Sequence, residues 1–146
     1  MSSEKTQAIP QKGVELLLVS QFEDDHQQLQ RIIRHSNWRL HRAGSQAEAL
    51  ESLRENCTPV VICESELPDG SWKEMHSELR QLPQPPSLVV TSRLADERLW
   101  SEVLNLGAYN VLAKPLDQQE VFHVVSLAWL FWKGQRAAPR ALARTA

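Results

Sequence analysis

The sequence has few cysteines, no long apolar run and no excess of basic residues. Its two cysteines, Cys57 and Cys63, are too few for a disulfide scaffold or a zinc cluster. No apolar run approaches the roughly 20 residues of a membrane span, and the first 13 residues lack the apolar core of a signal peptide. A net charge of −2 argues against a nucleic-acid partner. The chain also has no glycine-rich phosphate loop, so a nucleotide site has no support.

What the chain does contain is typical of one folded domain. Hydrophobic residues make up 42% and charged residues 23%, as in an ordinary globular protein. The length of 146 residues is enough for one core and too short for two. These features predict a cytoplasmic protein with a polar leader at 1–13, a folded domain at 14–133 and a basic tail rich in Ala and Arg at 134–146.

Short apolar runs and helical patterns alternate along the chain. The apolar runs are typical of strands buried on both faces, and they occupy 14–19, 59–63, 87–91 and 109–113. Residues 38–42 alternate between apolar and polar, which suits an edge strand. A helical pattern follows each strand, and Asp24 or Asp25 is expected to cap the first helix. The alternation predicts an α/β fold, a three-layer sandwich with a five-stranded parallel sheet and helices on both faces.

Polar side chains follow several of these strands. Ser20 and Gln21 come after the first strand, Glu64 ends the third, Thr91 the fourth, and Lys114 follows the fifth. Ligand sites in parallel α/β sheets lie at the carboxyl ends of the strands. We therefore expect a shallow pocket at this edge that holds a carboxylate, a hydroxyl and an ammonium group.

The order and spacing of four segments resemble the receiver domain of bacterial two-component response regulators, from about Val14 to Trp132. These segments are Val14–Val19 followed by Ser20, Glu64–Gly70, Val89–Ser92, and Gly107-Ala108 with Lys114-Pro115. The resemblance implies a flavodoxin-like strand order 2-1-3-4-5, a role in phosphorelay signal transduction and a sensor kinase as a possible partner. A small enzyme on the same architecture has less support, because the chain shows no nucleophile–base pair or cofactor motif.

The resemblance also shows that the reactive part of the site is altered. Glu64 stands where the family has the aspartate that accepts a phosphoryl group, and Ser20 and Gln21 stand where it has two acidic residues that hold magnesium. Magnesium prefers carboxylate oxygens, so no metal cofactor is expected at Ser20 and Gln21. Glu23 and Asp24 are weak candidates for a shifted metal site, and their ordinary use is to cap the first helix.

The contact residues of the site are partly kept. Thr91 and Lys114 match the hydroxyl and the lysine that contact the phosphoryl group, whereas Val111 replaces the switch aromatic. Glutamate is longer than aspartate by about 1.5 Å, and a misplacement of about 1 Å can cost on the order of a hundredfold in rate. Glu64 is therefore expected to be a poor phosphoacceptor. Two interpretations stay open, a structural ion pair with Lys114 or a partial mimic of the phosphorylated state.

These expectations favour a non-enzymatic receiver-like module that acts through protein–protein contacts. It is expected to work without phosphorylation or with Glu64 as a built-in phosphomimic. The alternative is an active phosphoacceptor receiver with a shifted metal or acceptor site, and only this alternative requires Mg²⁺.

Apolar residues on the last two helices exceed what an inward stripe needs. Tryptophan is enriched in interface hot spots, and exposed apolar patches mark binding surfaces. We expect a protein partner or a second copy of the chain to bind the face made by helix 96–106, strand 109–113 and the last helix, with no nucleic-acid or membrane partner. The candidate contact residues are Trp100, Leu104, Phe122, Trp129 and Trp132.

Overall fold

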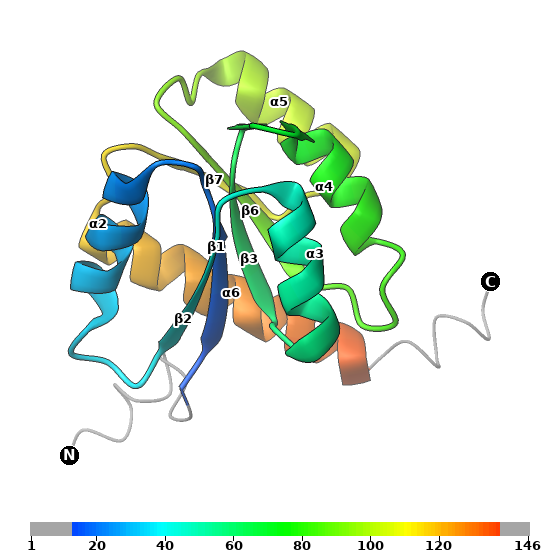
Figure 1. Cartoon of the computed structure of the whole chain (residues 1–146), viewed down its shortest axis with the longest axis horizontal. Coiled ribbons are helices and arrows are strands. Elements are labelled where there is room, and N and C mark those ends of the chain that lie inside the picture. The colour runs from blue at the N-terminus through cyan, green and yellow to red at the C-terminus, as the bar shows by residue number, and fades with distance from the viewer. Residues whose placement is uncertain (1–12, 138–146) are drawn as a thin grey trace.

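A parallel sheet of five strands forms the centre of the molecule in a computed structural model that describes residues 13–137 (Figure 1). The sheet order is β2-β1-β3-β6-β7, which is the expected order 2-1-3-4-5 when only these strands are counted along the chain. The predicted α/β fold is therefore confirmed. The elements are β1 (Glu15–Val19), α2 (Glu23–Ile33), β2 (Arg39–Ala43), α3 (Gln46–Glu55), β3 (Val60–Glu64), β4 (Glu66–Leu67), β5 (Gly70–Ser71), α4 (Trp72–Leu79), β6 (Ser87–Ser92), α5 (Glu97–Leu106), β7 (Asn110–Ala113) and α6 (Gln118–Ala137).

The sheet lies between two helical layers. Helices α2 and α6 cover one face, and α3, α4 and α5 cover the other (Figure 1). Successive side chains of a strand point to opposite faces. In β1, Leu16 and Leu18 consequently pack in the core under α2 and α6, and Leu17 and Val19 pack in the core on the opposite face. This two-sided burial explains why the central strands are continuous apolar runs.

Local capping residues define two of the helix ends. The Ser45 hydroxyl accepts a hydrogen bond from the Glu48 backbone N–H at 3.2 Å, and the Glu48 carboxylate accepts from the Gly44 N–H at 2.7 Å. Helix α5 ends at Gly107, whose φ of 91° lies in the left-handed region that favours glycine. These caps fix where α3 begins and where α5 ends.

The expected cap of the first helix is wrong. Helix α2 begins at Glu23 with Phe22 in the cap position, and no side chain caps it. Asp24 and Asp25 lie two and three residues after the cap position, so they are part of the first helical turn, where acidic side chains complement the helix dipole. The Asp25 carboxylate is buried and turns toward the sheet edge.

A two-residue antiparallel ladder between β4 and β5 follows β3. Asp69 lies between these two short strands. Its carboxylate accepts hydrogen bonds from the backbone N–H groups of Gln46 at 2.9 Å and Ala47 at 3.1 Å. The loop after β3 is thereby joined to the first turn of α3.

The last helix extends past the predicted end of the domain. α6 has 20 residues and continues to Ala137, past the boundary expected at 133. The predicted leader and most of the predicted tail lie outside the described residues. Within residues 13–137, no helix combines the length and apolarity that a bilayer span needs.

Candidate functional site

The carboxyl ends of the strands bring the predicted polar residues to one edge of the sheet. Ser20 follows β1, Glu64 ends β3, and Thr91 pairs with Glu64 in the β3–β6 register. Lys114 follows β7 directly. Gln21 does not join the group, because its side-chain amide donates a hydrogen bond to the Glu66 carbonyl at 3.2 Å.

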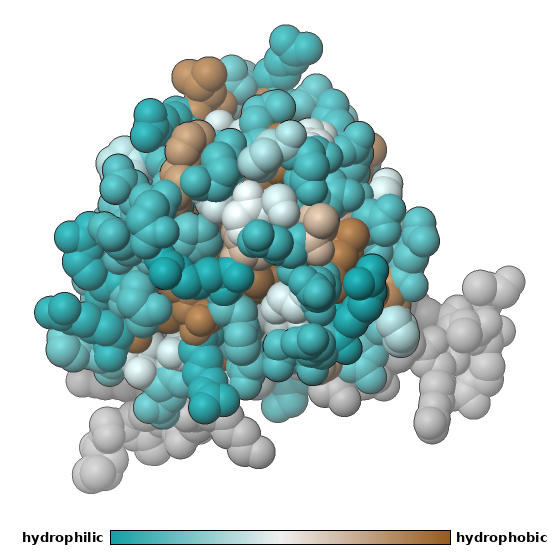
Figure 2. Space-filling view, in the orientation of Figure 1, coloured by the Kyte–Doolittle hydropathy of each residue, from teal (hydrophilic) through white to brown (hydrophobic). Residues whose placement is uncertain are grey.

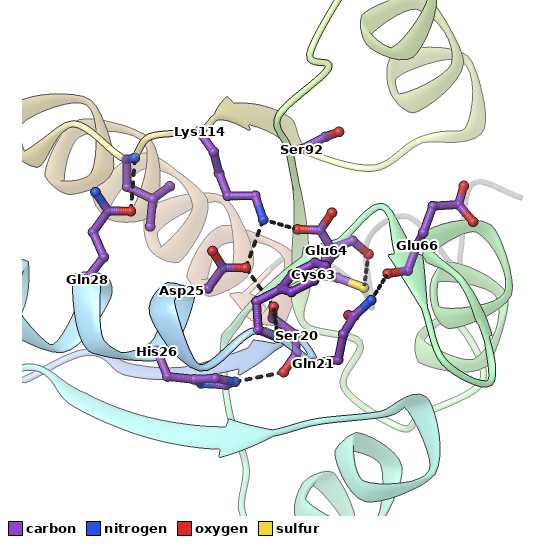
Figure 3. Close-up of polar contacts among 12 residues, drawn as sticks. Ser20, Gln21, Asp25, His26, Gln28, Cys63, Glu64, Glu66, Ser92 and Lys114 are labelled. Carbon is purple, nitrogen blue, oxygen red and sulfur yellow. Dashed lines mark hydrogen bonds and ion pairs between the residues drawn. The ribbon is translucent and has the colours of Figure 1, made fainter.

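Lys114 lies at the centre of this site between two carboxylates (Figure 3). Its Nζ is 2.5 Å from Glu64 Oε1 and 2.8 Å from Asp25 Oδ2. The Lys114 side chain is only 5% exposed, and both carboxylate side chains are below 10% exposure. Glu64 and Lys114 therefore form the ion pair that the sequence suggests, but a second acid shares the same ammonium group.

Asp25 is the site residue that sequence reasoning missed. The Ser20 hydroxyl donates a hydrogen bond of 2.6 Å to the same Oδ2 that contacts Lys114, so the carboxylate is held from two sides. The signal was present in the sequence: Asp25 lies four residues before Leu29 and eight before Ile33, on the buried stripe of α2. A carboxylate at that spacing faces the sheet, whereas its neighbours Glu23 and Asp24 do not share the stripe.

The end of β1 is also held by α2. His26 is 5% exposed, and its Nε2 lies 2.8 Å from the Ser20 carbonyl oxygen. Because a carbonyl oxygen only accepts hydrogen bonds, His26 Nε2 is the donor. Two side chains of α2, those of Asp25 and His26, thus fix the Ser20 backbone and hydroxyl (Figure 3).

The Phe22 ring covers the ammonium group from the solvent side of the site. The Lys114 Nζ lies 4.9 Å from the ring centroid, and the Arg93 guanidinium carbon lies 5.8 Å from it. Both distances are in the range of cation–π attraction. Phe22 itself is 41% exposed, so it forms the outer wall of the site.

Burial changes the ionisation of Glu64. Loss of hydration raises the pKa of its carboxyl, the hydrogen bond and charge of Lys114 oppose this rise, and the neighbouring Asp25 charge adds to it. With both acids ionised, the two carboxylates and one ammonium group leave one uncompensated negative charge. The net effect is a pKa of the Glu64 carboxyl above its ordinary value.

The remaining predicted contact residues lie near the site without joining its network. Thr91 is 1% exposed, and its hydroxyl has no hydrogen-bond partner among the described residues. Val111 is 1% exposed and packs in the core on the side of α3, α4 and α5. An aliphatic core residue thus occupies the position for which the resemblance implies a switch aromatic.

The residues of the site do not fit a magnesium ion. Ser20 has no charge and donates its hydrogen to Asp25, Gln21 is bonded elsewhere, and the carboxylates of Asp25 and Glu64 are both bound to Lys114. Over residues 13–137, no three His, Cys, Asp or Glu side chains gather in a way that could hold a metal. The two carboxylates that could bind a metal are therefore already bound to the Lys114 ammonium group.

The two weak metal candidates are placed differently. The Glu23 carboxylate pairs with Arg42 at 2.7 Å, and its side chain is 64% exposed. Asp24 lines an open cavity of about 560 Å³ beside the site, together with Asp25 and Lys114. Glu23 is thus paired with a residue of the edge strand β2, and of the two candidates only Asp24 lines the cavity beside the site.

The predicted partner residues divide into exposed and buried ones. Trp100 and Leu104 on α5 are 37% and 56% exposed. Phe122 and Trp129 on α6 are half-buried against the core, and Trp132 is buried. Trp132 therefore packs inside the molecule, and Trp100 and Leu104 are the two residues of this set that lie on the surface.

Comparison with known proteins agrees with the fold. Residues 16–126 match the response regulator receiver domain. The signal receiver domain of an HD domain-containing protein from Pseudomonas fluorescens Pf-5 is similar at 25% identity, with a TM-score of 0.78 over 86% of this chain and 93% of that one. No curated protein sequence is significantly similar to the chain.

Two further solved structures share the fold. A response regulator receiver domain protein from Clostridium thermocellum has 20% identity and a TM-score of 0.74 over 82% of this chain and 97% of that one. A two-component response regulator from Clostridium difficile has 19% identity and a TM-score of 0.72 over 79% and 94%. Since the family match covers most of the chain, this protein belongs to the response regulator receiver domain family.

Proposed function

We propose that this receiver domain is a non-enzymatic signalling module that acts through protein–protein contacts and works without phosphorylation. The observation that carries the proposal is the state of the acceptor position. Glu64 lies where the family accepts a phosphoryl group, and its carboxylate is buried and bound by Lys114. The same ammonium group is bound by Asp25, so the cation that would stabilise an incoming phosphoryl group is already neutralised.

Phosphoryl transfer depends on placement and on positive charge around the transferred group. Neither Ser20 nor Gln21 brings a carboxylate to hold a metal, and the Lys114 charge is shared between two acids. The longer side chain of Glu64 also moves the accepting oxygen by about 1.5 Å relative to an aspartate. Together these features support a site that does not accept a phosphoryl group at a useful rate.

Two versions of phosphorylation independence differ at Thr91. If Glu64 mimicked a phosphoryl group, the Thr91 hydroxyl would be expected to bond it, as it would bond a phosphate oxygen. The hydroxyl has no hydrogen-bond partner within the described residues, and Glu64 is instead drawn to Lys114. This arrangement favours a fixed ion-pair network over the phosphomimic version.

The partner surface that we propose lies on α5, β7 and α6. Figure 2 shows one face of the molecule that is mainly hydrophilic, and α6 crosses behind the sheet in this view (Figure 1). On α6, Leu127, Leu130 and Phe131 are 39%, 46% and 50% exposed, and Trp100 and Leu104 add apolar surface on α5. Exposed apolar side chains of this size are common in binding surfaces.

Sedimentation of the wild type and of the Trp100→Glu variant tests whether a second copy is the partner. Concentration-dependent association that the variant loses would support self-association through this face. Association that the variant retains would contradict it, and a wild type that stays monomeric would leave a different protein as the occupant of this surface.

The acceptor proposal is tested by incubating the protein with a small phosphoryl donor and Mg²⁺. The intact mass and the tryptophan fluorescence are then measured. We expect neither to change. A mass increase of one phosphoryl group on the wild type would overturn the proposal and favour the active phosphoacceptor with a shifted site.

A matched variant makes a negative result meaningful. The triple change Ser20→Asp, Gln21→Asp and Glu64→Asp restores the family's residues at the two acid positions and at the acceptor. Under the same conditions this variant is expected to gain the phosphoryl mass. The Glu64→Asp change alone is expected to stay unmodified, because it restores the acceptor without the acids.

A further inference from the structure

We propose that Lys114 is a built-in cation that fills a latent divalent-cation site formed by Asp25 and Glu64. The proposal rests on the proposed function and explains how the site holds its charges without a metal ion. Both carboxylates are buried, come from different elements and meet at one point, the Lys114 Nζ. Magnesium in proteins is bound through one or two carboxylates and keeps several waters, and Asp25 and Glu64 would supply the carboxylates of such a site.

The two carboxylate oxygens converge on the nitrogen at ion-pair distances. Glu64 Oε1 and Asp25 Oδ2 lie 2.5 and 2.8 Å from Nζ. Magnesium–oxygen distances are about 2.0–2.1 Å, so a metal at the nitrogen position would need each oxygen to move by less than about 1 Å. Ammonium and dication therefore compete for one position, and the lysine has the advantage of being covalently attached to the chain.

Asp25 supplies the charge that the end of β1 lacks. The Ser20 hydroxyl donates to Asp25 Oδ2 at 2.6 Å, which places the carboxylate of an α2 residue beside the position where the family has an acid. This carboxylate lies on the first turn of the helix and not at the strand end. There it binds Lys114, and we infer that Asp25 is the residue that holds the lysine in the site.

The surroundings of the ammonium group suit a lysine. Its side chain is 5% exposed, and the Phe22 ring centroid is 4.9 Å from Nζ. An aromatic ring attracts a cation but offers no oxygen ligand, so it contributes to lysine binding and gives nothing to the coordination of a metal. Phe22 thus favours the internal cation over an external one.

Binding of Mn²⁺, measured by electron paramagnetic resonance without any phosphoryl donor, tests the proposal. The wild type is expected to bind no Mn²⁺ at this site, whereas Lys114→Met is expected to bind one ion per chain. Adding Asp25→Asn to Lys114→Met is expected to weaken that binding by on the order of tenfold or more, since lost groups around metal sites typically cost this much. Lys73→Met, which removes a surface lysine, serves as the control and is expected to behave as wild type.

A second measurement covers the case in which Lys114→Met folds poorly. A ligand that binds only the folded state raises its stability. The urea midpoint of Lys114→Met is expected to be higher in MgCl₂ than in KCl of equal ionic strength, and that of the wild type is expected to be the same in both salts. Failure of Lys114→Met to fold in either salt counts against the proposal, because the metal should replace the lost charge.

Two outcomes overturn the inference: stoichiometric Mn²⁺ binding by the wild type, or a Lys114→Met variant that binds Mn²⁺ no better than Lys73→Met. Neither measurement involves phosphoryl transfer. Failure of the proposed function appears separately, as a phosphoryl mass on the wild-type protein, so the two failures are distinguishable.

Discussion

Replacing Lys114 by methionine removes one charge from the centre of the site and keeps most of the volume of the side chain. The carboxylates of Asp25 and Glu64 then face each other without a cation, at 5% and 6% exposure. Removing one partner of a buried ion pair typically costs about 3–5 kcal/mol, because the remaining charge stays buried without compensation. We expect Lys114→Met to fall in this range.

Two other variants set the scale of this effect. Asp25→Asn leaves the Lys114–Glu64 pair intact and removes one charged hydrogen bond, so its expected cost is about 1.5–3 kcal/mol. Lys73→Met removes a surface ion pair with Glu102, where the distance is 3.5 Å and the side chains are 50% and 37% exposed. Such pairs contribute about 0–1 kcal/mol, and this small loss is the control for deleting a lysine as such.

Equilibrium unfolding in urea, followed by tryptophan fluorescence, measures the three losses. An unchanged m-value would show that the variants alter stability and not the surface exposed on unfolding. The expected order of destabilisation is Lys114→Met, then Asp25→Asn, then Lys73→Met. If Lys114→Met cost no more than Lys73→Met, the buried network would not exist in solution, and the reasoning about the site would be refuted.

Three further predictions concern other positions. Burial raises the pKa of the Glu64 carboxyl above 4.5, the ordinary pKa of a glutamate. The free energy of unfolding of the wild type, relative to that of Glu64→Gln, should therefore fall as the pH rises above 4.5. An increase in this free energy over the same range would contradict the prediction. A thiol reagent should label exposed Cys57 in the folded protein. Buried Cys63, whose pKa is raised by burial, should be labelled only after unfolding. Labelling of both cysteines in the folded protein would refute this prediction. Gly107→Ala should destabilise the fold by about 1–2 kcal/mol, since φ is 91° there. Gly134→Ala, inside α6 with open space around it, should instead stabilise the fold by up to about 1 kcal/mol. Urea midpoints of the two variants that shift in the same direction would contradict these predictions.

The fold was predictable because its signals are local and repeated. Each central strand is an apolar run of the length that a sheet covered on both faces needs, and caps such as Ser45 and Gly107 mark some of the helix ends. The short β4–β5 ladder was not predictable from pattern, since two residues per strand give no periodicity. The same holds for the exact start of α2, where three consecutive acids offer several equivalent caps.

The site was predictable where its residues end strands, because parallel strands bring their carboxyl ends to one edge. Glu64, Thr91 and Lys114 follow this rule. Asp25 does not, because its place depends on the rotation of α2 about its axis, which the tertiary packing of Leu29 and Ile33 decides. A residue capable of capping was therefore assigned to the helix end, although its contact partner lies 89 positions further along the chain.

The bonds from Asp69 to the amides of Gln46 and Ala47 join two segments that are more than 20 residues apart. Backbone amides at a helix start lack an intrahelical acceptor, so these two depend for protection on a carboxylate from another loop. Their rates of hydrogen–deuterium exchange consequently report on the loop and not on the helix that contains them. A binding event that displaces the segment after β3 would cause faster exchange of the amides at the beginning of α3. Movement near the site could therefore be detected without attaching a label to the site.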